Sequence, residues 1–285
     1  MAFMSDEEFH FTLSDYQVFQ GFLQDACGIV LGDNKQYLVA NRVRRILENL
    51  DIHSLGELVK RIQQDPRSGL KEKVIDAMTT NETFWFRDVG PFETLRDVII
   101  NERLEGGAVD PLRIWSAACS SGQEPYSISM IIEEHKRKFP GVLKREPAIV
   151  ATDISSSILE AAKLASYDGL SVSRGLSESR RALFFDALEN HRFRVKSLIT
   201  QRVEFRPLNL LESYATLGGF DIVFCRNVLI YFSAERKQDI LRRMRATLRK
   251  GGVLVLGASE SLPQDLNSVY SAKRGPNGST YYVAI

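Results

Sequence analysis

The sequence contains few of the residues on which metal and disulfide chemistry depends. Its 285 residues include only three cysteines, Cys27, Cys119 and Cys225, and four histidines. The cysteines are far apart and form no CxxC pair, which argues against a disulfide framework or a zinc ribbon. No two histidines are four residues apart, and the HExxH motif is absent. We therefore expect no bound metal, and we expect the cysteines to be small buried side chains.

An excess of charge of one sign and a long apolar run are also missing. The 37 basic and 36 acidic side chains leave a net charge of +1, which argues against binding nucleic acid through bulk positive charge. No run of about 18 apolar residues exists, so we expect no membrane insertion. The first eight residues are acidic, unlike a secretion signal, and a cytoplasmic protein is expected. At roughly 150 residues per domain, the length predicts one large or two modest domains.

The first 80 residues have the pattern of a small helical domain. Residues 14–17 (SDYQ) and 54–57 (SLGE) each fit a capping box, which satisfies free N–H groups at a helix start. Apolar side chains recur at spacings of three and four, and they predict further helices over Gln36–Leu50 and Leu70–Met78. We assign residues 1–80 to this helical domain and residues 81–110 to a linker.

From residue 111 to residue 285, short apolar strands alternate with amphipathic helices. This pattern indicates an α/β domain with a doubly wound, mostly parallel sheet, whose ligand should lie beyond the carboxyl ends of the strands. Strands are expected over residues 112–117, 148–152, 203–206, 221–225, 253–257 and 280–284. Helices are expected over residues 125–139, 156–165 and 234–249, the last stopped by Gly251 and Gly252. Residues 170–200 interrupt the rhythm, and we interpret them as an inserted subdomain with a helix around residues 177–187 and a small hairpin.

The loop after the first expected strand, residues 117–125, suits a cationic ligand better than a dinucleotide. Only Gly122 of a GxGxxG pattern is present, and the charge of Glu124 would repel a pyrophosphate. Asp153, at the end of the second strand, is placed to accept hydrogen bonds from ribose hydroxyls. A ribose and a cationic amino acid together indicate S-adenosylmethionine. The alternative is that both carboxylates only stabilise helix N-termini.

Two further segments have polar residues where a ligand pocket is expected. Asn81, Thr83 and Arg87 lie in an aromatic-rich stretch between the two domains. Residues 224–232 (FCRNVLIYF) end a strand with a polar tip, which places Asn227 and Tyr231 at the carboxyl edge of the sheet. The Pro-Pro pair typical of amino-directed nucleic-acid methyltransferases is absent here, so a nucleobase amine is a poor candidate substrate.

These segments resemble the CheR family of bacterial chemotaxis receptor glutamate O-methyltransferases. The resemblance covers nearly the whole chain, and it rests on five ordered motifs at residues 80–87, 115–127, 151–154, 209–211 and 224–232. It implies a helical substrate-recognition domain, followed by a Rossmann-like S-adenosylmethionine-dependent methyltransferase domain with an inserted antiparallel β subdomain. The residues that match the family's cofactor-binding positions are Asn81, Thr83, Arg87, Glu124, Asp153, Asn209, Leu210, Asn227 and Val228.

The resemblance also implies a reaction and a partner. A glutamate side chain on a cytoplasmic receptor helix takes the methyl group, S-adenosylhomocysteine is the product, and Arg87 and Tyr231 match residues that orient the substrate carboxylate. The family's β subdomain can dock on a pentapeptide at the receptor tail. Members that do so have an extra glycine-containing turn, which residues 185–193 lack. Recognition without the tail is therefore expected, by a monomeric enzyme.

The reaction needs little from the protein beyond positioning. A free glutamate has a pKa of about 4.3 and is already ionised at neutral pH, so no strong general base is required. Residues 35–45 contain four basic and no acidic side chains, and from these we select Arg42 and Arg45 as receptor contacts. Two alternatives stay open: a methyltransferase of the same fold with another protein or a small molecule as substrate, or a non-catalytic module that binds the cofactor.

Overall fold

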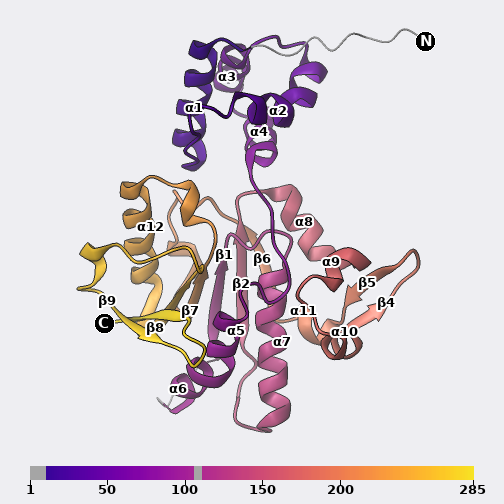
Figure 1. Cartoon of the computed structure of the whole chain (residues 1–285), viewed down its shortest axis with the longest axis vertical. Coiled ribbons are helices and arrows are strands. Elements are labelled where there is room, and N and C mark those ends of the chain that lie inside the picture. The colour runs from indigo at the N-terminus through magenta and orange to yellow at the C-terminus, as the bar shows by residue number, and fades with distance from the viewer. Residues whose placement is uncertain (1–10, 106–110) are drawn as a thin grey trace. The chain divides into compact units, whose positions relative to one another are not determined.

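The computed structural model describes residues 11–105 and 111–285 (Figure 1). The acidic first eight residues, on which the argument against a secretion signal rests, lie outside the described residues. The chain divides into two compact units. The first comprises the chain up to Thr80 together with Tyr231–Ser233, and the second comprises Asn81–Ile230 and Ala234–Ile285. None of the helices in the described ranges has the length and apolar character that crossing a membrane requires.

Four helices build the first unit: α1 (Leu13–Cys27), α2 (Gln36–Leu50), α3 (Leu55–Gln64) and α4 (Leu70–Met78). Helix α1 packs against α3, and α2 packs against α4. Inward-facing side chains such as Phe19, Val43 and Val74 are fully buried. The predictions for α2 and α4 are confirmed at both ends, and Ser54 caps α3 by accepting a hydrogen bond from the Glu57 N–H.

The start of α1 differs from the prediction. Thr12, rather than Ser14, is the N-cap, and its Oγ1 accepts a hydrogen bond from the Asp15 N–H at 3.1 Å. Two capping sequences therefore compete within one turn. The earlier start is favoured because Asp15 also accepts a hydrogen bond from Thr12 Oγ1 at 2.6 Å and from the Gly56 N–H at 3.3 Å, which ties the first turn of α1 to α3.

A seven-stranded sheet in the order β6-β2-β1-β7-β8-β10-β9 forms the centre of the second unit (Figure 1). Its strands are β1 (Arg113–Ala117), β2 (Ala148–Asp153), β6 (Val203–Pro207), β7 (Phe220–Cys225), β8 (Leu248–Leu256), β9 (Tyr270–Arg274) and β10 (Thr280–Ala284). The first five in sheet order are parallel, and β10 runs antiparallel to both its neighbours. The doubly wound, mostly parallel sheet is thus confirmed, with its topological switch point between β1 and β7.

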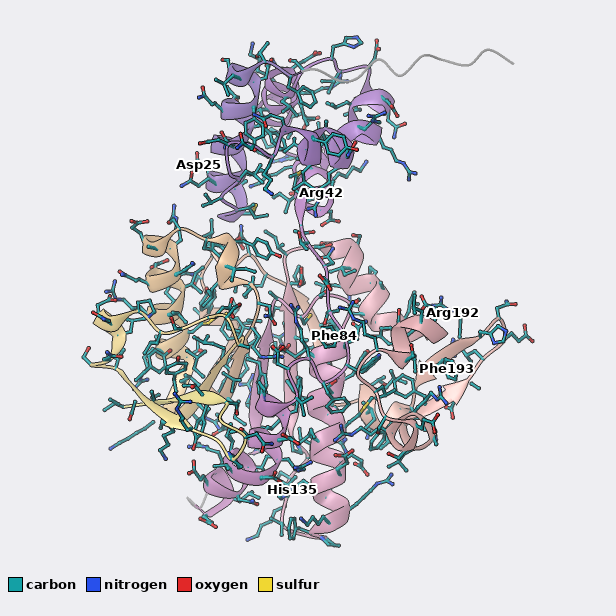
Figure 2. The ribbon with its side chains drawn as sticks, in the orientation of Figure 1. Asp25, Arg42, Phe84, His135, Arg192 and Phe193 are labelled. Carbon is teal, nitrogen blue, oxygen red and sulfur yellow. The ribbon has the colours of Figure 1, made fainter. Side chains whose placement is uncertain are left out.

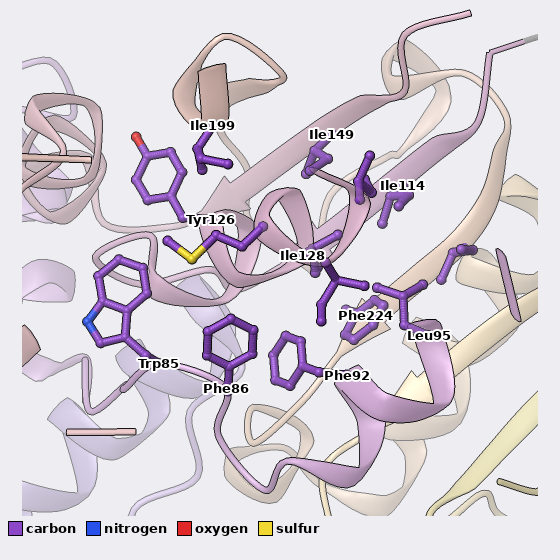
Figure 3. Packing of buried hydrophobic residues seen from close by; sticks show 14 of the residues in the cluster. Trp85, Phe86, Phe92, Leu95, Ile114, Tyr126, Ile128, Ile149, Ile199 and Phe224 are labelled. Atoms are coloured by element: carbon purple, nitrogen blue, oxygen red, sulfur yellow. The ribbon is translucent and has the colours of Figure 1, made fainter. Parts of the chain in front are cut away.

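Helices and short turns connect these strands. They are α5 (Gly90–Thr94), the π-helix η1 (Leu95–Ile99), α6 (Ile100–Glu105), α7 (Gln123–Lys138), α8 (Ser156–Leu164), α11 (Ser197–Thr200), η2 (Ala215–Leu217), η3 (Leu229–Tyr231), α12 (Ala234–Thr247) and η4 (Gln264–Leu266). Helices α7 and α8 pack on β2 and β6, and α12 packs on β8. The main core lies between α7, the segment around Trp85–Phe92 and the sheet, where Ile114, Ile149 and Phe224 point inward (Figure 3).

The inserted subdomain is confirmed, but it begins earlier than expected. It consists of β3 (Ser166–Asp168), α9 (Gly169–Ser173), α10 (Glu178–Phe184), β4 (Phe185–Ala187) and β5 (Arg192–Val195). The strands form a separate antiparallel sheet in the order β3-β5-β4. The prediction missed β3 and extended the helix into β4, because strands of three residues carry almost no periodic signal.

The prediction that Gly251 and Gly252 stop the last long helix is wrong. Helix α12 ends at Thr247, and Leu248 already pairs with Phe220 as part of β8. The glycines instead lie at an irregular point within β8. The register of β8 against β7 shifts there, and Gly251 has a φ of +70°. A Cβ at position 252 would lie 2.8 Å from a backbone oxygen, so the strand requires glycine there. Strand β9 was not predicted.

Candidate cofactor and active site

The loop between β1 and α7 folds tightly against its surroundings. Ala118, Ser120 and Gly122 all have positive φ values, and the Cys119 N–H donates to the Thr152 carbonyl of β2 at 2.9 Å. A Cβ at Gly122 would lie 3.1–3.2 Å from three neighbouring side-chain atoms, in a conformation with a φ of +93° that already favours glycine. The loop therefore keeps its backbone close to the ends of β1 and β2.

Asp153 fixes this loop from the end of β2. Its carboxylate is buried, and it accepts hydrogen bonds from the Ser120 N–H at 2.8 Å and the Ser155 N–H at 3.0 Å. The Ser120 hydroxyl in turn donates to the Asn81 carbonyl at 2.9 Å. The structure thus brings together Asn81, Asp153 and the loop after β1.

Glu124, in the first turn of α7, is already engaged within the protein. Its carboxylate accepts hydrogen bonds from Ser116 Oγ at 2.8 Å and from Arg226 Nη1 at 2.9 Å. Burial raises the pKa of Glu124, whereas Arg226 and Ser116 lower it. From the sequence, Glu124 was predicted to suit a cationic ligand such as an amino acid ammonium. The structure shows that two partners orient it, although a carboxylate has about four acceptor positions in all.

Arg226, which was not predicted as a site residue, lies beside Glu124 and the Arg87 segment. Its side chain is only 1% exposed. Besides Glu124, its guanidinium donates to Asp88 Oδ2 at 2.8 Å and to the Arg87 carbonyl at 2.6 Å, and it lies 5.4 Å from the ring centroid of Phe92. One buried cation therefore connects α7 to the segment that carries Arg87. From the sequence, an arginine beside a strand end does not reveal this connecting role, because its partners are distant in the chain.

Aromatic and cationic contacts hold the segment that carries Asn81, Thr83 and Arg87. Arg87 Nη1 donates to the Glu82 carbonyl at 3.0 Å. Arg87 and Arg174 both lie over the ring of Phe84, at 5.5 and 4.5 Å from its centroid (Phe84 is labelled in Figure 2). Arg174 also pairs with the Glu82 carboxylate at 2.8 Å.

Trp85 packs the same segment against the inserted subdomain. Its ring meets Tyr167 and Phe185 edge-on, at centroid distances of 5.0 and 5.1 Å. Thr83, two residues before Trp85, is half-buried. The Asn81–Arg87 stretch therefore belongs to the second unit and has a defined position in it.

The remaining predicted cofactor residues follow β6 and β7. The Leu208 N–H donates to the Asp153 carbonyl at 2.9 Å, which places the half-buried Asn209 and the buried Leu210 next to the end of β2. Asn227 and Val228 follow β7 and are half-buried, and Asn227 has a φ of +58°. All nine predicted cofactor residues therefore belong to the second unit. Five of them end or closely follow parallel strands at their carboxyl ends, namely Asp153, Asn209, Leu210, Asn227 and Val228.

The other predicted site residues belong to the first unit. The carbonyl of Tyr231 accepts a hydrogen bond from the Val30 N–H at 2.9 Å. Arg42 donates to the carbonyls of Met78 and Thr79, at 2.6 and 2.9 Å, and to Thr80 Oγ1 at 3.1 Å. Arg42 thus ties α2 to the end of α4, whereas Arg45 on the same helix is exposed. The pairing of Arg87 with Tyr231 and the receptor contacts stay predictions.

The chemistry of the second unit's site fits S-adenosylmethionine. Carboxylates at the ends of β2 and in α7 accept hydrogen bonds from hydroxyl and ammonium groups and favour a positively charged ligand. The glycine at position 122 lets the loop after β1 pack closely against the side chains of Ala162, Tyr126 and Tyr167. Across residues 11–105 and 111–285, no group of three or more His, Cys, Asp or Glu side chains is arranged to hold a metal ion. The three cysteines are buried and free, as expected.

Fold and site together define a Rossmann-like, S-adenosylmethionine-dependent methyltransferase. Residues 81–276 match the family described as "CheR methyltransferase, SAM binding domain", and residues 14–79 match "CheR methyltransferase, all-alpha domain". The chain belongs to the CheR methyltransferase family.

Curated relatives agree with this membership. The chain is 57% identical over 248 residues to "Chemotaxis protein methyltransferase Cher2" of Pseudomonas putida and 58% identical over 249 residues to "Chemotaxis protein methyltransferase 1" of Pseudomonas aeruginosa. Each alignment covers 87% of this chain and 90% of the relative. "Chemotaxis protein methyltransferase 1" of Vibrio cholerae is 49% identical over 253 residues, covering 88% of this chain and 91% of the relative.

Proposed function

We propose that this protein transfers methyl groups to glutamate side chains on the cytoplasmic helices of chemoreceptors, forming methyl esters. The main support for this proposal is the position of Arg87. Its segment accepts a hydrogen bond at the Asn81 carbonyl from the loop after β1, and another at the Arg87 carbonyl from Arg226. A guanidinium in this position suits a carboxylate substrate. The names of the curated relatives, which are chemotaxis protein methyltransferases, support the same substrate class.

The residues that we expect to hold the cofactor are Asn81, Thr83, Arg87, Glu124, Asp153, Asn209, Leu210, Asn227 and Val228. Bound S-adenosylmethionine supplies a methyl group that is activated by the positive charge on sulfur. The buried carboxylates of Asp153 and Glu124 favour that positive charge over a neutral ligand. Asp153 is held by two backbone N–H groups, so it does not have to reorganise when the cofactor binds.

Arg87 and Tyr231 are proposed to orient the receptor glutamate. Arg87 uses one N–H for the Glu82 carbonyl, and an arginine has five such donors, so several are available for a substrate carboxylate. Holding one carboxylate oxygen leaves the other to attack the methyl carbon. The new O–CH3 bond forms as the S–CH3 bond breaks, and the electron pair of that bond stays on sulfur. No proton has to move, because the carboxylate is ionised at neutral pH.

Receptor recognition is proposed to use the basic side of α2 rather than a receptor tail. Arg45 is exposed, and Arg42 retains N–H donors beyond its three bonds to the α4 end. In the inserted subdomain, the connection from β4 to β5 spans only residues 188–191 and contains no glycine. Asn190 and His191 supply its positive φ values. This short turn supports a mode of recognition that does not require the tail pentapeptide.

The proposal is tested by labelled methyl transfer to chemoreceptor-containing membranes, with and without the receptor tails. We expect base-labile carboxyl methyl esters in both cases. An Arg87→Ala variant should lose roughly 100-fold or more in kcat, while its Kd for S-adenosylhomocysteine changes far less. Equal losses in both quantities would rule out an orienting role for Arg87.

Charge reversal at α2 tests the receptor contact separately. Arg45→Glu should raise the KM for receptor and leave cofactor binding unchanged, because Arg45 is exposed. Glu48→Lys, an exposed position on the same helix, serves as the matched control and should not raise this KM. If the wild-type protein binds the cofactor and methylates no receptor, the substrate proposal fails, and the two alternatives, another substrate or a non-catalytic module, take its place.

A further inference from the structure

Glu260 accepts three backbone hydrogen bonds, two from the loop that follows β7 and one from Gly257, directly after β8. Its Oε2 accepts from the Gly257 N–H and from the Asn227 N–H, both at 2.8 Å, and its Oε1 accepts from the Leu229 N–H at 2.7 Å. Such bonds to an ionised carboxylate are about twice as strong as bonds between neutral groups. One side chain thus fixes the backbone on both sides of Val228, a predicted cofactor residue.

Gly257, directly after β8, leaves the space in which Glu260 and Asn227 meet. A Cβ at this position would lie 2.7 Å from Glu260 Oε2, 2.9 Å from the Asn227 N atom and 2.9 Å from Asn227 Nδ2. Real Cβ atoms do not approach other atoms this closely, so any larger residue would push the Asn227 loop away. Asn227 itself has a φ of +58°, a left-handed conformation that is uncommon for non-glycine residues and that asparagine tolerates better than most.

The charge of Glu260 also reaches the rest of the site. Burial is the largest cause that raises the pKa of Glu124, and the Glu260 carboxylate adds to it, against the lowering effect of Arg226 and Ser116. Glu260 therefore contributes negative potential at the strand ends where a cationic cofactor is expected. Its bonds with Asn227 and Leu229 link the ends of β7 and β8.

We propose that Glu260, together with Gly257, is a positioning residue of the cofactor site. Glu260 fixes the backbone of Asn227, Val228 and Leu229, so that Asn227 and Val228 meet S-adenosylmethionine in one conformation. It acts through this loop and does not contact the substrate. The proposal rests on the proposed assignment of Asn227 and Val228 to the cofactor.

A Glu260→Gln substitution tests this role. Glutamine offers one acceptor oxygen in place of two, and its NH2 group would face backbone N–H groups, so the loop loses at least one anchor. We expect the Kd for S-adenosylhomocysteine, measured by calorimetric titration, to rise roughly tenfold or more at an unchanged stoichiometry. Gly257→Ala should weaken binding in the same way, by displacing Asn227.

Asp221→Asn is the matched control. Like the half-buried Glu260, the buried Asp221 has three donors, namely Arg103, Arg249 and the Arg113 N–H, but it lies at the start of β7. A purely structural role predicts the same pattern for both carboxylates: a lower Tm and fewer binding sites, with an unchanged Kd in the folded fraction. Our proposal predicts that pattern for Asp221→Asn only. A wild-type Kd in Glu260→Gln or in Gly257→Ala overturns it.

The double variant Glu260→Gln/Asn227→Ala separates this proposal from the site assignment. If Glu260 acts through Asn227, the two changes in binding free energy should be clearly less than additive. Additive effects would overturn the route through Asn227. If Asn227→Ala and Val228→Ala both bind S-adenosylhomocysteine as the wild type does, the assignment of these two residues fails, and the proposal falls with it. A failure of receptor methylation in the wild type would leave this binding test intact.

Discussion

The two ends of the parallel strands in the second unit both bury charged groups, but they use them differently. At the amino ends, Asp221 pairs with Arg103 and with Arg249, the latter at 2.9 Å. Arg202, only 2% exposed, pairs with Glu146 and with Glu133, the latter at 2.6 Å. These are mainly contacts between oppositely charged side chains that tie neighbouring elements together.

At the carboxyl ends, the buried Asp153 and the half-buried Glu260 mainly hold loop backbone. Asp153 accepts two N–H bonds and Glu260 accepts three. Glu124 is the exception that pairs with an arginine, and that arginine, Arg226, also binds the backbone carbonyl of Arg87. Buried charge alone therefore does not mark a functional site. The distinguishing feature is a charge that fixes loop backbone at the strand ends where ligands of such sheets bind.

The largest effect should follow from removing the charge of Arg226, which joins Glu124 to the Arg87 segment. Arg226→Met keeps much of the volume but leaves the Glu124 carboxylate buried without its cation. We expect the free energy of unfolding to fall by about 3–5 kcal/mol, because an uncompensated buried charge is costly. Methyl transfer should fall by roughly 100-fold or more, since Arg87 loses its backbone anchor. Urea unfolding and initial rates with saturating cofactor measure the two effects.

A second substitution checks the cause of that loss. Arg226→Met/Glu124→Gln removes the unpaired charge and should recover part of the stability, but not the activity. If the single variant Arg226→Met has the stability and the methyl-transfer rate of the wild type, Arg226 does not connect Glu124 to the Arg87 segment.

The corresponding change at the amino ends should separate stability from function. Arg202→Met breaks the pairs with Glu133 and Glu146, and we expect a loss of about 1–3 kcal/mol. The loss is smaller than for Arg226 because Glu146 is 46% exposed and water can solvate it. The Kd for S-adenosylhomocysteine and the kcat of the folded protein should stay within about twofold of the wild type. A tenfold change in the Kd or in the kcat would show that charges at the amino ends of the strands also serve the site, against the distinction between the two ends.

The sequence carried enough information for most of the helices of the first unit and for six of the seven strands of the main sheet. Gln36–Leu50 and Leu70–Met78 follow the 3.6-residue apolar period over their whole length, so their limits were predictable. The start of α1 was not, because Thr12 and Ser14 both offer caps, and the bonds of Asp15 with Thr12 and with the distant Gly56 favour the earlier start. Strand β3 was missed because it has three residues and its partner, β5, lies more than 20 residues away.

The candidate site was predictable only where one segment carries the signal. Asn81, Asp153 and Asn227 stand in motifs that can be recognised within a few residues. Arg226 and Glu260 act through partners 102 and 33 residues away, respectively, in Glu124 and Asn227. No local period or spacing encodes such pairs. They become visible only once the sheet brings the strand ends together.

His135 should give the smallest effect, and it lies on the amino-end side of the unit, near the end of α7 (Figure 2). It is buried, and its Nε2 has no hydrogen-bond partner among the described residues. Burial lowers the pKa of His135, and the charge of Lys138 adds to this. Because the folded pKa lies below the unfolded value of about 6.5, the unfolded state binds the proton first, and stability is lost as the pH falls below that value.

We therefore expect His135→Gln to flatten the decline in the free energy of unfolding between about pH 7.5 and pH 5. Each unit of pKa difference is worth only about 1.4 kcal/mol, so the change is modest. His191→Gln, at an exposed turn position, is the control and should not alter the slope. Affinity for S-adenosylhomocysteine should not respond to His135→Gln at either pH, because His135 belongs to the end of the sheet that stabilises the fold. An altered Kd, or an unchanged slope, would contradict that assignment.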